Sequence, residues 1–243
     1  MLKDIENWYT SWFDSPYYHI LYKERNYREA QIFMDNLTHY LNLPEKAKVL
    51  DLACGKGRHS VFLNLLGYKV IGADLSENSI QFAKKFENPT LKFIIQDMRE
   101  PFDLQYDAVF NLFTSFGYFE EDSEDILVLK NIKNCLKENG FFVFDFLNTS
   151  FVKNTLVKKE IKIVDGISFY IKREIVDGFI LKHISFFADG ENHHYTERVK
   201  YLDLQKMNSF FEKVGLNLKY VFGDYQLNAF DENNSKRLIL IAQ

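Results

Sequence analysis

The chain has 243 residues, 47% of them hydrophobic and 26% charged, with a formal net charge of -4. This length and composition allow one large core, whereas the acidic balance offers no broad basic surface for a nucleic-acid backbone. Because no apolar run approaches the roughly 20 residues that span a bilayer, and no apolar signal segment opens the chain, we expect a cytoplasmic protein that binds neither nucleic acid nor membrane.

The first part of the chain alternates predicted helices and strands. From Asn26, apolar residues recur at helical spacing until Pro44 closes the helix. Buried strands are expected at 47–53, 68–74, 91–95, 106–111 and 141–147. Helices are expected between them at 58–66, 76–87 and 123–138. This alternation implies right-handed crossovers and therefore a doubly wound parallel α/β sheet.

A different pattern follows. Three Asp-Gly pairs stand 12 positions apart between β-rich segments, at residues 165–166, 177–178 and 189–190. Asp-Gly favours two-residue hairpin turns, so residues 160–202 are predicted to form a four-stranded antiparallel meander. A helix at 203–214 and strands at 216–222 and 237–242 complete the chain.

The turn at 189–190 would set Ile184 opposite Tyr195 and Lys182 opposite Glu197. One face of the meander is then mostly apolar and the other polar. We predict two parts of the chain: an α/β domain (1–149 and 203–243) and an inserted β subdomain (150–202). The subdomain is interpreted as a substrate cap, with a homodimer contact through its apolar face as the alternative.

The segment VLDLACGKGRHS (49–60) places Gly55 and Gly57 between a buried strand and a helix, where α/β sheets bind nucleotides. A tight turn alone would also require glycine. Asp74 lies 19 positions after Gly55, at the end of the second strand, where a carboxylate can accept from both ribose hydroxyls. Its alternative role is an N-cap.

Asp51 decides between two nucleotide cofactors. A carboxylate before the glycines would repel a pyrophosphate but would favour the cationic methionine group of S-adenosylmethionine. Ser60 also replaces the third glycine of the dinucleotide fingerprint, which disfavours a nicotinamide-dependent oxidoreductase. Asp97 follows the third strand and could accept from the adenine amino group, while the Met98 N–H serves a ring nitrogen; a plain turn residue is the alternative.

The motifs VLDLACGKGRHS, IGADLS, IIQDM and YDAVFNLFTSFGYF together resemble the class I S-adenosylmethionine-dependent methyltransferases, over residues 26–148 and 203–243. The resemblance implies a Rossmann-like seven-stranded sheet with its last strand antiparallel. It also implies a cofactor site in four parts: Asp51, Ala53, Gly55 and Gly57 around the methionine, Asp74 and Leu75 at the ribose, Asp97 and Met98 at the adenine, and Asn111 and Leu112 at the sulfonium.

Within that superfamily the chain is similar to a bacterial small-molecule branch with a β-rich insertion after the fifth strand. The segment NLFTSF (111–116) lacks the Pro-Pro-aromatic motif of enzymes that methylate the amino groups of DNA bases. Cys54 and Cys135 belong to no Cys/His cluster, so no metal is expected. We therefore expect methyl transfer to a small molecule by in-line displacement, with a noncatalytic S-adenosylmethionine-binding regulatory module as the alternative.

Further side chains are candidates for covering the cofactor and for binding the methyl acceptor. The Tyr-rich segment 15–26 is predicted to cover the cofactor with Tyr18 or Tyr22 and to pair Arg25 with the methionine carboxylate, unless it packs on a sheet edge instead. The candidate acceptor residues are Tyr18, Phe113, Phe116, His194, Arg198 and Tyr225. His193, His194 and Tyr225 are candidate bases by residue type only, and a solvated outer face is the alternative for His194 and Arg198.

Overall fold

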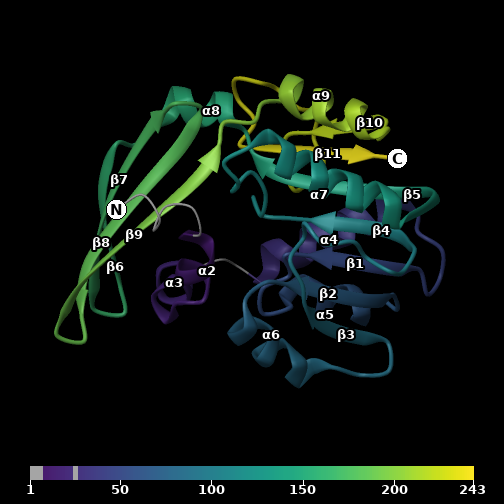
Figure 1. Cartoon of the computed structure of the whole chain (residues 1–243), viewed down its shortest axis with the longest axis horizontal. Helices are drawn as coiled ribbons and strands as arrows, with labels where there is room; N and C mark the ends of the chain where they lie inside the picture. The colour runs from purple at the N-terminus through teal and green to yellow at the C-terminus, as the bar shows by residue number, and fades with distance from the viewer. Residues whose placement is uncertain (1–7, 24–26) are drawn as a thin grey trace.

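The computed structural model describes residues 8–23 and 27–243, which form a seven-stranded main sheet and a separate four-stranded sheet (Figure 1). The main sheet has the order β10-β11-β5-β4-β1-β2-β3. Its strands are β1 (Lys48–Leu52), β2 (Lys69–Asp74), β3 (Leu91–Ile95), β4 (Tyr106–Asn111), β5 (Leu136–Leu147), β10 (Leu218–Phe222) and β11 (Arg237–Ala242). The first five pair in parallel, and β11 is antiparallel to both β5 and β10. The predicted Rossmann-like fold is confirmed.

Helices cover both faces of the main sheet. They are α4 (Tyr27–Leu41), α5 (Arg58–Leu65), α6 (Glu77–Ala83) with the short 3-10 helix η1 (Lys84–Phe86), α7 (Asp122–Cys135) and α9 (Leu204–Val214). The prediction that α7 extends to residue 138 is wrong. Leu136 already pairs with Tyr106 of β4, and Asn139 has a positive φ of 65°, which no helix accommodates.

Strand β5 shows how side-chain alternation divides the core. Phe142, Phe144 and Phe146 face the cluster that contains α7 and α9, whereas Val143 faces the cluster that contains α4. Asp145 follows Val143 at a spacing of two, so it points to the α4 side of the sheet. A fully buried carboxylate thus lies among apolar side chains near the carboxyl end of β5.

The inserted sheet is the predicted meander. Its strands are β6 (Lys159–Val164), β7 (Ile167–Val176), β8 (Phe179–Ala188) and β9 (Glu191–Lys200), in sequential order. In all three Asp-Gly turns both residues have positive φ, which is the type I′ geometry that matches strand twist. The predicted pairs Ile184 with Tyr195 and Lys182 with Glu197 are both present.

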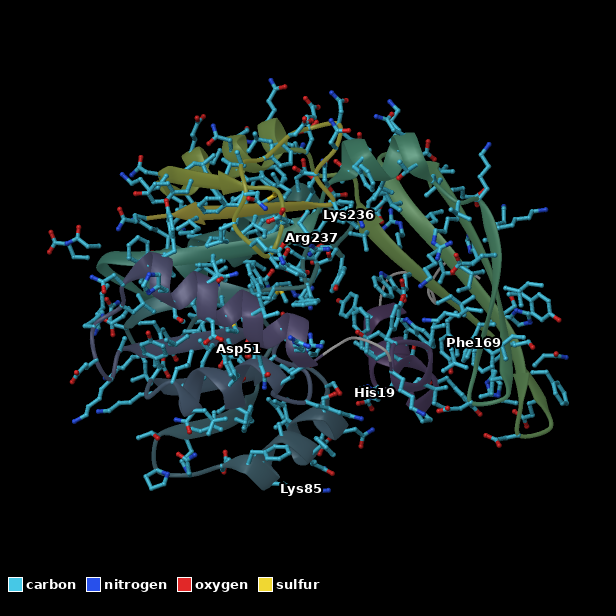
Figure 2. The ribbon with its side chains drawn as sticks, turned by 180° about the vertical axis from the view of Figure 1, so that it is seen from behind. His19, Asp51, Lys85, Phe169, Lys236 and Arg237 are labelled. Carbon is cyan, nitrogen blue, oxygen red and sulfur yellow. The ribbon has the colours of Figure 1, made fainter. Side chains whose placement is uncertain are left out.

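Three helices were not predicted: α2 (Trp8–Phe13), α3 (Pro16–Leu21) and α8 (Thr149–Thr155). Figure 1 shows α2 and α3 between the two sheets, and α2 contacts β9. In Figure 2, His19 on α3 lies between Asp51 of the main sheet and Phe169 of the inserted sheet. The helices bury the apolar face of the inserted sheet, so this chain itself covers the surface that the dimer alternative required.

The packing of α2 has a local cause. Trp12 is fully buried, with its ring 4.5 Å from that of Tyr195, and its Nε1 donates to Glu197 at 2.8 Å. Ser15 then caps α3, and Pro16 occupies the first turn, where its missing N–H costs nothing. No helix in the described ranges is long and apolar enough to cross a membrane.

Candidate active site

The loop after β1 turns sharply at residues with positive φ. Ala53, Gly55 and Gly57 have φ values of 60°, 54° and 80°. A Cβ added at Gly55 would meet no described atom within 4 Å, so this position borders open space at the carboxyl edge of the sheet. Backbone can therefore approach a ligand closely at Gly55, which fits a cofactor cradle.

Gly57 has a different role. A Cβ there would lie 2.6 Å from the ring of Phe93, and a Cβ at Gly72 would lie 2.6 Å from the same ring. Phe93 is buried, so the ring packs closely against both glycines. The structure thus gives Gly57 a packing role, and its predicted contact with the methionine group stays a prediction.

Asp51 is buried at the end of β1, where its Oδ2 accepts a hydrogen bond of 2.5 Å from the Ser60 hydroxyl. Burial raises the pKa of Asp51 to about 6, while the Ser60 hydrogen bond lowers it and the charge of Asp74 raises it. A cation beside this carboxylate would stabilise its ionised form. The Asp51 carboxylate therefore suits a cationic ligand.

Asp74, at the end of β2, ties the glycine loop to the next helix. Its Oδ2 accepts from the Gly55 N–H at 2.7 Å and its Oδ1 from the Ser76 N–H at 2.8 Å. Burial raises the pKa of Asp74 despite these bonds. The Ser76 hydroxyl, which caps α6, donates to Asp14 at 2.5 Å, so the turn after α2 reaches the predicted ribose position. The Leu75 side chain is partly exposed beside it.

Asp97, two residues after β3, is held by Arg99. The guanidinium Nε lies 3.1 Å from both carboxylate oxygens, and Nη2 donates to Oδ2 at 2.6 Å. Met98 packs against the main apolar cluster, and its carbonyl accepts from Asn131. The predicted adenine subsite therefore has an ordered carboxylate with a cation bound to one side.

Asn111 ends β4 beside Leu52 of β1. Its Nδ2 donates to the carbonyls of Leu52 and Ser115, but its buried Oδ1 has no hydrogen-bond partner among the described residues. A buried acceptor without a partner costs about 1–3 kcal/mol, which a bound donor would recover. This orphaned oxygen fits the predicted place of Asn111 beside a cationic cofactor group, and Leu112 is buried next to it.

The chain after Asn111 is strained. Phe113 and Thr114 are consecutive non-glycine residues with φ values of 58° and 66°; such conformations cost about 1–3 kcal/mol each and concentrate at functional sites. Asp145 holds this turn: its carboxylate accepts from the Phe113 N–H at 2.8 Å, and its carbonyl accepts from the Thr114 N–H at 2.9 Å. We call residues 112–121, which begin at this turn, the acceptor loop.

Sequence reasoning missed Asp145 and its partner. Arg237, the first residue of β11, donates from Nε to the Asp145 Oδ1 at 2.7 Å and from Nη2 to the Thr114 hydroxyl at 3.1 Å. The signal was present, because one carboxylate interrupts the apolar run FFVFDFL (141–147). A buried charge of this kind requires a partner, and only the pairing of β5 with β11 supplies it.

The carboxyl edge therefore carries an open glycine, an orphaned amide oxygen and ordered carboxylates at Asp51, Asp74, Asp97 and Asp145. The methyltransferase domain family matches residues 43–198, well over half of the chain. The chain belongs to the S-adenosylmethionine-dependent methyltransferases. This confirms the predicted family and S-adenosylmethionine as the methyl donor.

Individual relatives extend this result. The chain is 41% identical over 108 residues to the putative methyltransferase YqeM of Bacillus subtilis, a match that covers 43% of this chain and 44% of YqeM. This match thus spans less than half the length of that curated relative. Among solved structures, an S-adenosylmethionine-dependent methyltransferase from Clostridium acetobutylicum is similar with a TM-score of 0.79 and 20% identity, over 93% of this chain and 95% of that one. CalS10, an amino pentose methyltransferase from Micromonospora echinaspora, has a TM-score of 0.71 and 18% identity, over 94% and 97%.

An aromatic stack lies beside the glycine-containing loop that follows β1. The Phe113 ring stacks on His59 at 5.0 Å and lies 5.3 Å from Tyr225, which in turn packs on Phe33 at 4.4 Å. Burial and the charge of Arg58 lower the pKa of His59 to about 3, so this imidazole is neutral. Tyr225 and Phe113, predicted acceptor residues, are thus brought together.

Tyr18 and Tyr22, which are predicted to cover the cofactor, lie in the N-terminal segment that packs against the inserted sheet. Tyr18 packs against Trp12, and the Tyr22 hydroxyl donates to Glu197 at 2.5 Å. Lys182 contacts both Tyr22 and Glu197. Arg25 lies outside the described residues. The N-terminal helices are therefore anchored to the inserted sheet, and Asp14 links them to the predicted ribose end.

The remaining acceptor candidates are dispersed. Phe116 is buried against Phe144, a core position. His194 is exposed and hydrogen bonds to Ser185, whereas His193 stacks on Phe186 at 4.9 Å. Arg198 pairs with Glu120 of the acceptor loop at 2.6 Å. Phe116 belongs to the acceptor loop itself and Arg198 contacts that loop through Glu120, whereas the hydrogen bond of His194 lies within the inserted sheet.

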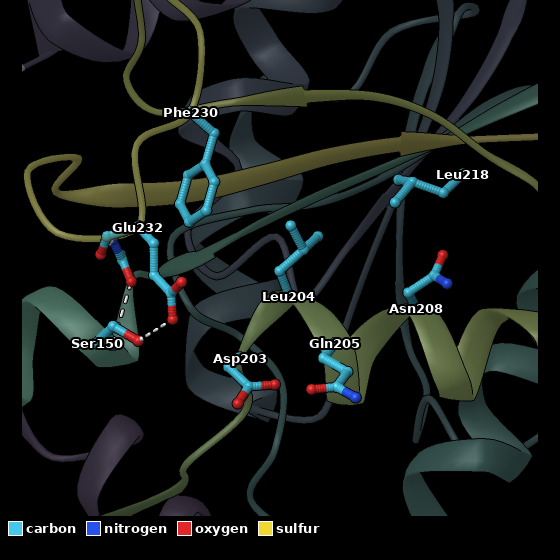
Figure 3. A pocket seen from close by; sticks show the side chains of 9 residues that line it. Ser150, Asp203, Leu204, Gln205, Asn208, Leu218, Phe230 and Glu232 are labelled. Carbon is cyan, nitrogen blue, oxygen red and sulfur yellow. Dashed lines mark hydrogen bonds between the residues drawn. The ribbon is translucent and has the colours of Figure 1, made fainter.

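A separate hollow lies between α8, α9 and β10, where Phe230 and Leu204 face each other and Ser150 bonds Glu232 (Figure 3). None of the predicted site residues lines it. Within residues 8–23 and 27–243, no three His, Cys, Asp or Glu side chains gather as a metal site.

Proposed function

We propose that this methyltransferase transfers the methyl group of S-adenosylmethionine to a small molecule held against the acceptor loop. One observation carries the proposal: the loop that begins beside the cofactor residue Asn111 contacts both the N-terminal helices and the inserted sheet. An acceptor bound there would meet the methyl donor on one side and these added elements on the other.

The contacts of the loop are specific. The Gly117 carbonyl accepts from the Lys200 N–H of β9 at 2.8 Å, and Glu120 pairs with Arg198. The Tyr118 ring lies 5.1 Å from Trp8 of α2. Because one loop carries all three contacts, a change in the inserted sheet or in α2 reaches the cofactor edge through it.

The chemistry depends mainly on alignment. S-adenosylmethionine supplies a methyl group on an already activated leaving group, so holding the acceptor in line contributes much of the rate. The Asp145 and Arg237 pair serves this alignment by fixing the strained turn at Phe113. Of the three candidate bases, Tyr225 lies closest to this turn, with its hydroxyl 3.4 Å from the Asp145 Oδ2. Tyr225 is therefore our candidate for orienting the acceptor, with its hydroxyl oxygen as a hydrogen-bond acceptor.

A small acceptor is supported from two directions. The acceptor loop lacks the motif of DNA amino methyltransferases, and the net charge of -4 provides no broad phosphate-binding surface. The similar structure CalS10 is an amino pentose methyltransferase. By this likeness we propose a small polar molecule as the acceptor class.

A labelled-methyl screen tests the proposal. The full chain is incubated with a metabolite extract and methyl-labelled S-adenosylmethionine, and labelled products are identified by mass spectrometry. We expect label in a small molecule with the wild type and none with Gly55→Val, which blocks the cofactor cradle. Saturable cofactor binding without label in any small molecule would instead indicate the noncatalytic regulatory module.

A further inference from the structure

We propose that Arg99 is a positioning residue that orients the Asp97 carboxylate toward the adenine amino group and connects this subsite to the acceptor loop. The inference rests on the proposed function in one respect, the use of Asp97 for the adenine. It assigns a new role to a side chain for which sequence reasoning had found none.

Arg99 holds Asp97 with its backbone as well as with its side chain. In addition to the guanidinium bonds, the Arg99 backbone N–H donates to the Asp97 Oδ1 at 2.9 Å. Each carboxylate oxygen thus has two contacts from Arg99, and rotation of the carboxylate would break these paired bonds. The Asp97 side chain is still 20% exposed, so a further donor can reach it.

Arg99 is itself immobilised from the other side. Its Nη1 donates to Glu124 in the first turn of α7 at 2.8 Å. Its guanidinium lies 4.7 Å from the centre of the Phe119 ring, and Phe119 contacts Tyr9 of α2 at 6.0 Å. Because the guanidinium is a rigid planar fork, fixing it against Phe119 and Glu124 also fixes Asp97.

The negative charge of Asp97 favours a ligand that donates a hydrogen bond to it. Burial raises the pKa of Asp97, but the hydrogen bonds and charge of Arg99 lower it more, so the net shift is downward. The carboxylate is then ionised at neutral pH and can only accept hydrogen bonds. It suits an amino group at the 6-position of the base and disfavours a carbonyl oxygen there.

Calorimetric titration with two demethylated cofactors tests this role without any methyl acceptor. S-adenosylhomocysteine and S-inosylhomocysteine differ at the 6-position, where an amino group is replaced by a carbonyl. For the wild type we expect a preference for the adenine form of about 10- to 100-fold, since one charge-assisted hydrogen bond is lost and a repulsion gained.

The variants separate positioning from simple stabilisation. Arg99→Met should lower the preference at least severalfold, Glu124→Gln should lower it less, and Arg99→Lys should restore part of it. Lys137→Met is the matched control. Lys137 forms a comparable, partly exposed ion pair with Asp107 at 2.8 Å near the start of β4, whereas the predicted site lies at the carboxyl end of this strand. Lys137→Met should lower the melting temperature without changing the preference for the adenine form.

Two results would overturn the inference, and both are distinguishable from failure of the proposed function. An unchanged preference in both Arg99 variants removes the positioning role, whatever happens to their melting temperatures. Equal binding of both cofactors by the wild type removes Asp97 as the adenine acceptor, while the methyltransferase proposal stands. Binding of neither cofactor would refute the proposed function itself.

The link to the acceptor loop has its own readout. Hydrogen exchange of residues 116–125 should slow when S-adenosylhomocysteine binds to the wild type. This protection should weaken in both Arg99→Met and Glu124→Gln, because each removes one side of the bridge. Equal protection in the wild type and in both variants would show that the loop does not depend on Arg99.

Discussion

Replacing Gly55 and Gly57 separately by alanine should divide stability from cofactor binding within one loop. Both positions have positive φ, which costs an L-residue about 1–2 kcal/mol. At Gly55 the new methyl group meets no described atom, so this is the whole expected loss of unfolding free energy. At Gly57 the methyl group would lie 2.6 Å from Phe93, and overpacking adds about 1–3 kcal/mol. The total for Gly57→Ala is therefore about 2–5 kcal/mol.

Cofactor affinity should follow the opposite order. The methyl group of Gly55→Ala enters the open space where the backbone approaches the ligand, and we expect at least a tenfold weaker binding of S-adenosylhomocysteine, about 1.4 kcal/mol. Gly57→Ala should lose less affinity than stability at a temperature where it remains folded. Urea unfolding followed by circular dichroism, together with calorimetric titration, measures both quantities. A Gly55→Ala variant with a native spectrum and wild-type affinity would refute the assignment of this loop to the cofactor.

Three further predictions concern carboxylates. Asp74→Ala should weaken S-adenosylmethionine binding by about 1.5–3 kcal/mol, and it should also destabilise the ligand-free chain because two backbone N–H groups lose their acceptor; unchanged affinity in calorimetry would contradict the ribose role. Burial raises the pKa of Asp51 from 3.8 to about 6, so the folded state binds the carboxyl proton more tightly than the unfolded state does. The contribution of this proton to the free energy of unfolding is complete below pH 3.8 and is lost as the pH rises through 6. Asp51→Asn should therefore gain about 2–3 kcal/mol of unfolding free energy relative to the wild type between pH 4 and pH 7, and a pH-independent difference in urea unfolding would exclude it. Glu197→Gln removes the charged acceptor of Trp12 and Tyr22, so hydrogen exchange in residues 8–23 should speed up by about 10-fold or more, whereas unchanged exchange would show that Glu197 does not anchor these helices.

Local sequence signals were sufficient for most of the fold and for the side chains at the carboxyl edge of the main sheet. Alternation of strands and helices predicted the parallel sheet because each crossover is a local event with a fixed hand. The Asp-Gly turns predicted the register of the inserted sheet, down to the pair of Ile184 with Tyr195, because a two-residue turn fixes which residues face each other. Asp51 and Asp74 could be placed together from the sequence because the carboxyl ends of neighbouring parallel strands meet at one edge, whereas Asn111 was named only by the family resemblance, and the cofactor roles of all three stay predictions.

Contacts between distant parts of the chain decided the rest. The packing role of Gly57 depends on Phe93, and the strained turn at Phe113 depends on Asp145 and Arg237, a pair separated by 92 positions. Trp12 likewise finds its acceptor, Glu197, at a distance of 185 positions. A sequence shows that a buried charge or an aromatic helix needs a partner, but not which residue supplies it, because that choice is made only when the two sheets and the N-terminal helices pack together.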